Sequence, residues 1–250
     1  MNPTAFAGKR VVVSGAGRDF GRTLAIMLAS EGATVELSAR NLDAAEAVAA
    51  TIRDRGGRAR AHACDVADPA SIAAFAEAVA GDGSAIDILV LNAARWLEGE
   101  ALDSVDDADI VDTVSSTLTG AMVLTSRLLP ALRRAGQADI LAMVSVCGEP
   151  GYLRSNAHPA FYAAKHGVAG FCDVLGARLA REGIRVTGLF PPDFDNVDPL
   201  SPDWHAPRGP GSLLGEPAIW NAVRFALTQP RDGGVRRIHF EGQTRAELGL

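Results

Sequence analysis

The sequence has few of the residues that hold small or metal-dependent proteins together. Its 250 residues include only three cysteines, Cys64, Cys147 and Cys172, which are widely spaced and odd in number. These are typical of small buried hydrophobic residues in a reducing compartment, not of a disulfide framework. The five histidines show no spacing typical of metal ligands, so we expect no catalytic metal.

Long apolar runs and an excess of positive charge are also missing. No apolar run approaches the roughly 18 residues of a membrane span, and the first nine residues form no signal-peptide core. The net charge of −6 argues against a surface for nucleic acid or an anionic membrane. We therefore expect a cytoplasmic protein with neither kind of partner.

Tyrosine and lysine are scarce, with two of each against 22 arginines, yet one of each lies in Tyr162-Ala163-Ala164-Lys165. Positions three apart share a face of a helix, so the ammonium of Lys165 can lie beside the phenol of Tyr162. A neighbouring positive charge favours the phenolate and lowers the phenol pKa, which would allow proton exchange near neutral pH. The alternative is a surface pair without chemistry.

Short β-rich runs alternate with alanine-rich amphipathic stretches along the whole chain. This alternation, with near-continuous apolar strands, predicts a doubly wound parallel α/β sheet of the Rossmann type with about seven strands and helices on both faces. A length of 250 residues without a linker fits one domain, 1–250. We expect strands at 10–14, 34–39, 58–64, 86–91, 140–145, 184–190 and 235–240, and helices at 21–31, 42–55, 69–80, 105–134, 160–181 and 217–228.

One segment, 191–217, interrupts this rhythm with seven prolines. It follows the carboxyl end of a predicted strand, where open α/β sheets bind their ligands. Long loops in compact domains are usually functional or disordered. We expect a substrate lid; a disordered insertion is the alternative.

The first predicted strand runs into a glycine-rich turn and then a helix. Backbone amides in such a turn can approach a pyrophosphate, aided by the helix dipole. The next strand ends at Arg40 without the acid that would bind a ribose 2′-hydroxyl, and Arg18 in the turn could join Arg40 around a 2′-phosphate. This favours NADP(H) over NAD(H), although either arginine could be an ordinary surface charge.

Together, these motifs resemble the short-chain dehydrogenase/reductase family across nearly the whole chain. The glycine loop at 15–21, Cys64-Asp65-Val66, Asn92-Ala93-Ala94, the run 140–148 with Ser145, Tyr162 with Lys165, and Pro191 occur in the family's order. The family motif is written with two or three residues between its tyrosine and lysine, and two alanines lie between Tyr162 and Lys165.

The resemblance implies roles for these residues. Ser145 would hydrogen-bond the substrate oxygen, Tyr162 would exchange a proton with it, and Lys165 would hold the nicotinamide ribose and lower the tyrosine pKa. The expected cofactor-binding residues are Gly15, Gly17, Arg18, Asp19, Phe20, Gly21, Arg40, Asn41, Asp65, Val66, Asn92, Ala93, Tyr162, Lys165, Pro191 and Pro192.

Four features depart from the family pattern. Asp19 replaces the middle glycine of the loop, where it could cap the following helix or repel the pyrophosphate. Thr117 replaces a helix asparagine of the catalytic relay, and Pro192 replaces the glycine after Pro191. Ser145 and Tyr162 lie 17 residues apart, a few more than usual, so residues 149–159 are expected to enlarge one wall of the pocket.

The sequence therefore predicts an NADPH-dependent reductase of a moderately apolar ketone or aldehyde, working reversibly. Two alternatives remain open: a lyase or isomerase without net hydride transfer, and a dinucleotide-binding sensor or scaffold with impaired catalysis. The resemblance also implies a homodimer or homotetramer packed through the helices at 105–134 and 160–181. Residues expected around the substrate mouth are Trp96, Leu153, Phe161, Phe194 and Trp204, with His158 nearby.

Overall fold

The structure, a computed structural model, describes residues 5–209 and 211–242. Its centre is a seven-stranded sheet in the order β3-β2-β1-β4-β5-β6-β9, in which every neighbouring pair is parallel. The predicted doubly wound parallel sheet is confirmed. The strands are β1 (Arg10–Ser14), β2 (Thr34–Ala39), β3 (Arg58–Ala63), β4 (Ile88–Leu91), β5 (Ala138–Met143), β6 (Ile184–Phe190) and β9 (Arg237–His239).

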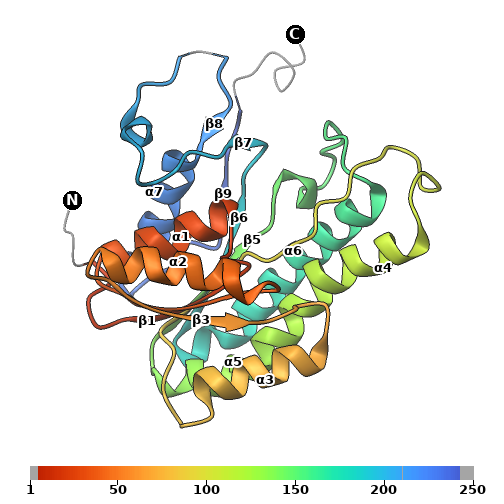
Figure 1. Cartoon of the computed structure of the whole chain (residues 1–250). Helices are drawn as coiled ribbons and strands as arrows, with labels where there is room; N and C mark the ends of the chain where they lie inside the picture. The colour runs from red at the N-terminus through yellow and green to blue at the C-terminus, as the bar shows by residue number, and fades with distance from the viewer. Residues whose placement is uncertain (1–4, 210, 243–250) are drawn as a thin grey trace.

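Helices cover both faces of this sheet (Figure 1). One face packs against α1 (Asp19–Ser30), α2 (Leu42–Asp54) and α7 (Glu216–Leu227). The opposite face packs against α3 (Pro69–Ala80), α5 (Gly120–Arg134) and α6 (Pro159–Leu179). Another helix, α4 (Asp107–Val114), precedes α5 and contacts α6.

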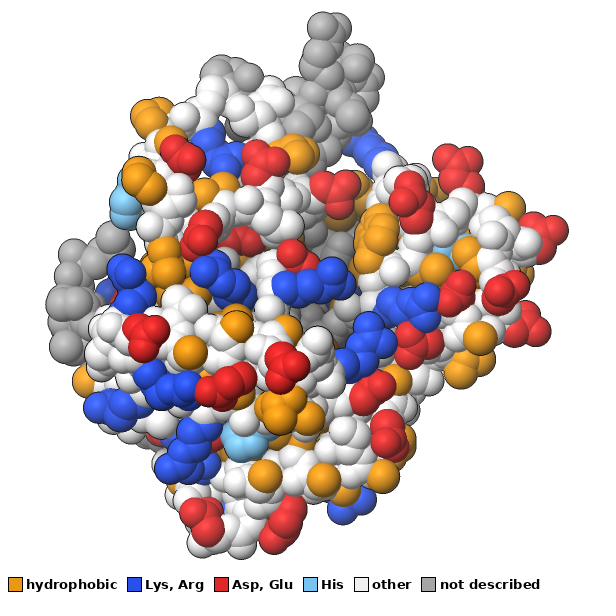
Figure 2. Space-filling view, in the orientation of Figure 1, with side chains coloured by type: hydrophobic (Ala, Val, Ile, Leu, Met, Phe, Trp, Pro, Cys, Tyr) orange, Lys and Arg blue, Asp and Glu red, His pale blue; other side chains and the backbone are white. Residues whose placement is uncertain are grey.

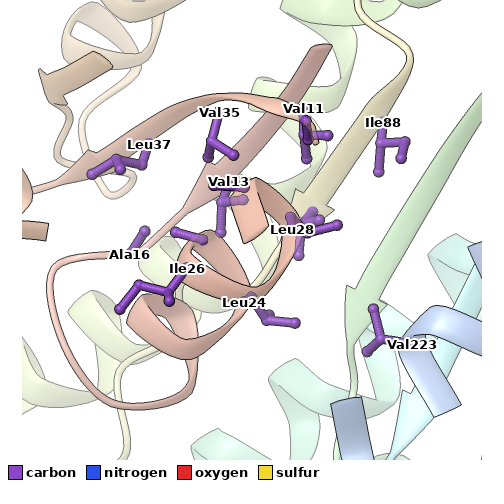
Figure 3. Packing of buried hydrophobic residues seen from close by; sticks show 14 of the residues in the cluster. Val11, Val13, Ala16, Leu24, Ile26, Leu28, Val35, Leu37, Ile88 and Val223 are labelled. Carbon is purple, nitrogen blue, oxygen red and sulfur yellow. The ribbon is translucent and has the colours of Figure 1, made fainter. Parts of the chain in front are cut away.

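The two layers of core follow from the alternation of side chains along a strand. Val11 and Val13 of β1 lie in the cluster beneath α1, whereas Val12 lies in the cluster on the other face. Figure 3 shows Val11 and Val13 among the side chains of β2 and α1. Each fully buried side chain of this size contributes about 1.5–3 kcal/mol, so a strand that is apolar at every position is stable only in the middle of such a sandwich.

Most element bounds differ from the predicted ones by one or two residues, and two of the differences bear on the site. The helix predicted at 105–134 is interrupted by a π-helical stretch, Ser115–Thr119, between α4 and α5. Strand β5 ends at Met143 and not at Ser145, because Ser145 has a φ of 88°, outside the range of strand geometry. Both changes lie beside the carboxyl edge of the sheet.

The segment 191–217 folds over this same edge. It contains two short paired strands, β7 (Phe194–Asp195) and β8 (Leu214–Gly215), and a 3-10 turn at Pro202–His205; residue 210 lies outside the described residues. It contacts α1 through the rings of Phe20 and Phe194, 5.4 Å apart, and through Arg22 and Asp198, 3.1 Å apart. A lid role for this segment stays a prediction.

Acidic and basic side chains intermingle on the face shown in Figure 2, with no continuous patch of one sign. Among the described helices, none combines the length and apolar character needed to cross a bilayer.

Candidate active site

A cavity of about 720 Å³ opens at the carboxyl edge of the sheet. A volume of this size is typical of a site for a small molecule or cofactor. The residues after six strands, β1 to β6, line it, because parallel strands all end at the same edge. It contains Ser145 and Lys165 and every predicted cofactor residue except Tyr162: Gly15, Gly17, Arg18, Asp19, Phe20, Gly21, Arg40, Asn41, Asp65, Val66, Asn92, Ala93, Pro191 and Pro192.

The glycine turn fits an extended ligand backbone because side chains have no room there. Gly15 has a φ of 68°, and a Cβ on it would lie 2.8 Å from the Cα of Ala93. A Cβ on Gly21 would lie 2.1 Å from the carbonyl oxygen of Gly15. Since α1 begins within this turn, its unpaired N–H groups and positive dipole end suit a pyrophosphate.

Asn92 joins this turn to the neighbouring strand. Its side-chain amide donates hydrogen bonds to the carbonyl oxygens of Gly15, at 3.1 Å, and Ser14, at 3.3 Å. The buried hydroxyl of Ser14 in turn accepts the backbone N–H groups of Asn92 and Ala93. The sequence analysis did not single out Ser14, because a serine at a strand end carries no signal of its own.

Asp19 does not cap α1. It is the first helical residue, while the N-cap position belongs to Arg18, and neither side chain accepts a capping hydrogen bond. The carboxylate of Asp19 lies 3.4 Å from the Arg18 guanidinium, and both side chains are exposed at the cavity. The capping prediction is therefore wrong. Asp19 also has a φ of 48°, a left-handed conformation that glycine adopts more readily.

The end of the cavity beside β2 and β3 has the polar groups that an adenosine moiety needs. Arg40 is exposed at the end of β2. Next to it, Asn41 caps α2 by accepting the N–H of Asp43 at 2.8 Å. The carboxylate of Asp65 accepts the N–H of Ala67 at 2.9 Å and so is fixed beside Val66.

Ser145 lies at the opposite end, directly after β5. Its left-handed backbone is unusual for a residue with a side chain and is a form of strain often found at functional sites. The N–H of Ser145 donates to the carbonyl of Leu189 at 3.1 Å, and its hydroxyl accepts the N–H of Cys147 at 3.3 Å. Because the hydroxyl is used as an acceptor, its proton remains available for a ligand in the cavity.

Lys165 of α6 reaches the same region. Its ammonium donates to the carbonyl of Met143, two residues before Ser145, at 2.7 Å. It also lies 5.3 Å from the centre of the Phe161 ring. Burial lowers the pKa of Lys165 to about 8, because removing water disfavours its charged form.

Tyr162 is turned away from the cavity. Its phenol oxygen accepts the N–H of Ser155 at 3.0 Å and donates to the carbonyl of the same residue at 3.3 Å. Burial, with a hydrogen bond to the Cys147 side chain, raises the phenol pKa above its ordinary value. The predictions of a lowered pKa and of a phenol facing the substrate are therefore wrong in this structure.

Phe161 holds the position expected for the phenol. It lines the cavity with Ser145 and Lys165 and packs edge-on against Trp96, with ring centres 4.9 Å apart. Phe161 precedes Lys165 by four residues and Tyr162 precedes it by three, and both spacings bring two side chains near one another on a helix. A motif with three intervening residues would fall on Phe161, and the sequence analysis treated this ring only as part of the mouth.

The predicted relay residue Thr117 does not line the cavity. It is buried in the π-helical stretch, and its hydroxyl has no hydrogen-bond partner among the described residues. The preceding residue, Ser116, faces the cavity instead. A relay role for Thr117 therefore stays a prediction.

Of the five residues predicted around the substrate mouth of the cavity, three line it. Trp96, Phe161 and Phe194 line the cavity, whereas Leu153 is 83% exposed outside it and Trp204 is 6% exposed and packs into the core. Arg95, which the sequence analysis missed, also lines it; its guanidinium bonds Asp109 and Asp112 of α4 at 2.5 and 2.6 Å.

The described residues contain no group of three side chains suited to a metal ion. His158, expected near the mouth, is buried: its Nδ1 accepts the N–H of Ala160 at 3.1 Å and its Nε2 donates to the carbonyl of Leu102 at 3.2 Å. It therefore caps α6, the helix that carries Phe161 and Lys165.

The chain is similar in sequence to named dehydrogenases and reductases. The chain is 36% identical over 186 residues to D-threitol dehydrogenase of Mycolicibacterium smegmatis, covering 74% of this chain and 69% of that protein. It is 30% identical over 226 residues to the 3-oxoacyl-[acyl-carrier-protein] reductase FabG of Escherichia coli, covering 88% of this chain and 90% of that protein.

Solved structures share the fold. A metagenomic short-chain oxidoreductase in complex with NADP matches with a TM-score of 0.79 and 27% identity, over 94% of this chain and 97% of that one. A gluconate 5-dehydrogenase from Beutenbergia cavernae, described as putative and NAD(P) dependent, with bound NADP, matches with a TM-score of 0.82 and 26% identity, over 99% and 100% of the two chains. Residues 9–200 match the family described as short chain dehydrogenase. With the sheet, the glycine turn and the cavity in agreement, this chain belongs to the short-chain dehydrogenase family of oxidoreductases.

Proposed function

We propose that this protein is an NADP(H)-dependent oxidoreductase that interconverts a carbonyl compound and an alcohol. The observation that supports it best is the single cavity, which contains the glycine turn, Arg18 and Arg40 at one end and Ser145 and Lys165 at the other. The related dehydrogenases and reductases, and the NADP complexes among the solved structures, support the same class of reaction.

The preference for NADP(H) rests on the adenosine end. An acid at the end of the second strand would bind a ribose diol and repel a 2′-phosphate, and Arg40 stands there instead. Arg18 lines the same end of the cavity and supplies a second guanidinium, whose planar geometry suits a phosphate.

At the other end, the dinucleotide would supply hydride chemistry when bound. The Ser145 hydroxyl would donate to the substrate oxygen and stabilise the negative charge that develops there. Lys165 would orient the ribose beside it. The aromatic wall of Trp96, Phe161 and Phe194 favours a moderately apolar ketone or aldehyde.

The test is an assay of the purified protein with a panel of ketones and aldehydes, in which NADPH and NADH absorbance are followed separately. We expect the protein to consume NADPH in preference to NADH. The variant Ser145→Ala should react about 100-fold or more slowly while its NADPH affinity is retained. Absence of turnover with every carbonyl, in a protein that binds NADPH, would overturn the proposal.

A second candidate, a dinucleotide-binding sensor, is favoured by one observation: Phe161 and not a tyrosine faces Ser145 and Lys165 in the cavity. A sensor would bind NADPH tightly and change its shape or assembly without consuming it. The same assay separates the two candidates, because a sensor gives a binding signal and no product.

A further inference from the structure

Reduction of a carbonyl requires a proton at the substrate oxygen as well as a hydride at carbon, and the structure restricts which group can supply it. Tyr162 cannot do so in this arrangement, because its phenol bonds Ser155 outside the cavity. Phe161, in the cavity, has no proton to give. Among the described residues, Ser145 and Lys165 line the cavity and carry dissociable O–H and N–H groups beside the end of β5.

Of these two, only Lys165 is acidic enough to lose a proton near neutral pH. Its ammonium has three N–H donors, and the described residues provide an acceptor for one of them, the carbonyl of Met143. No carboxylate forms an ion pair with it in the described part of the chain, so its charge is balanced only weakly by the Phe161 ring. Burial lowers its pKa to about 8.

Lys165 is also in the right place. Its ammonium binds the carbonyl of Met143, two residues before Ser145. The turn after Ser145 also packs closely against α6, because a Cβ on Gly148 would lie 2.8 Å from the carbonyl oxygen of Lys165. Ser145 and Lys165 both line the cavity, so a ligand bound there can contact both side chains.

We propose that Lys165 donates the proton to the substrate oxygen, a role that rests on the proposed carbonyl reductase function. As the substrate carbon accepts a hydride from the reduced dinucleotide, its C=O π electrons move to oxygen and an N–H proton of Lys165 passes to that oxygen. The N–H electron pair stays on nitrogen, and the neutral amine takes a proton from water through the cavity mouth. Ser145 holds the oxygen, and the Phe161 ring lies beside the amine, with its centre 5.3 Å from the nitrogen.

The test compares four variants with the native protein in single-turnover oxidation of NADPH, from pH 5.5 to 9.5: Lys165→Arg, Phe161→Tyr, Lys165→Arg with Phe161→Tyr, and the matched control Tyr162→Phe. The native rate should be constant in acid and fall above about pH 8. The rate of Lys165→Arg should be about 100-fold or more below the native rate, because a guanidinium keeps its proton at any of these pH values. Its NADPH affinity and thermal melting are measured alongside; arginine keeps N–H donors for the ribose, so the affinity should fall far less than the rate.

A phenol at position 161 should restore part of the rate lost in Lys165→Arg, and Tyr162→Phe should react at the native rate. The proposal would be overturned if Lys165→Arg reacted at the native rate with the same decrease in rate above pH 8. A large decrease in the rate of Tyr162→Phe would also overturn it. An inactive native protein with an active Phe161→Tyr would also overturn the role of Lys165 while leaving the site competent for reduction. Inactivity of both would overturn the proposed function itself.

Discussion

Asp19 combines two unfavourable features in the glycine turn: a left-handed backbone and a carboxylate where a pyrophosphate is expected. The conformation costs about 1–2 kcal/mol in a residue with a side chain, and the charge opposes an anionic ligand.

We predict that Asp19→Gly binds NADPH about tenfold more tightly, because it removes both the charge and the Cβ. Asp19→Asn is the matched control, since asparagine tolerates the left-handed region and carries no charge. Fluorescence titration gives the affinities. If asparagine alone reproduces the gain, repulsion is the cause; equal affinity in all three proteins would contradict the prediction.

Arg40 allows a second prediction, about cofactor choice. Arg40→Asp should reverse the preference from NADPH towards NADH, because a carboxylate at the end of β2 binds a ribose diol and repels a 2′-phosphate. Dissociation constants for both dinucleotides measure this without relying on turnover. Arg60→Asp, an exposed substitution on β3 outside the cavity lining, is the control and should leave the ratio unchanged.

Single residues also mark the limit of prediction from sequence. That nearly all of the predicted cofactor residues line one cavity was predictable, because a glycine turn or an asparagine after a strand has one place in a parallel sheet. The choice between positions 161 and 162 was not, since residues three and four before a lysine both lie near it on a helix and differ by 100°. Only the observed packing of Phe161 against Trp96 decides between them.

The first turn of α7 holds a buried carboxyl group that no sequence pattern indicated. Glu216 is 1% exposed; one of its oxygens accepts the hydroxyl of Thr23 on α1 at 2.7 Å, and the other has no partner among the described residues. Burial raises its pKa to about 7, with Asp19 and Asp198 nearby raising it and Arg22 lowering it.

This carboxyl group should make stability depend on pH. Its pKa in the folded protein exceeds the ordinary value of 4.5, so folding favours the protonated form. The contribution of this group to stability is therefore fully present below about pH 4.5 and is lost as the pH rises through about 7. We predict that Glu216→Gln melts several degrees higher than the native protein at pH 8 and equally at pH 4.5. Thermal melts at both pH values test this, and the same difference at both would contradict it.

Elements with a regular pattern were predicted within a few residues, because caps such as Asn41 fix where the helices begin. The π-helical stretch was not predictable, since Ser115–Thr119 has the composition of an ordinary helix and only the tertiary packing imposes the extra residue.

The parallel, doubly wound arrangement of the whole molecule followed from the alternation of strands and helices, because right-handed crossovers between parallel strands leave few topologies. The oligomeric state of the protein does not follow from such rules. Exposed apolar side chains lie on each of three helices, Val111 on α4, Met122 on α5 and Val174 on α6, and single residues of this kind are also common on monomers.

We predict a homodimer or homotetramer through these helices, as the resemblance implied. Val174→Arg should shift the protein towards the monomer in light scattering after size exclusion, because a charge in an apolar interface lacks a partner. Leu153→Arg, an exposed position on the loop before α6, should leave the mass unchanged. A monomeric native protein would contradict the prediction.

All three cysteines of the chain are buried, and burial raises the pKa of Cys64 to about 11 and of Cys172 to about 12. Thiolates are the reactive form, so the native protein should resist maleimide dyes. A cysteine introduced at Ser212, on the exposed outer part of the 191–217 segment, would then be the sole site of fast labelling. Because the native thiols react slowly, a dye at this position can report by fluorescence whether the 191–217 segment moves when NADPH is added.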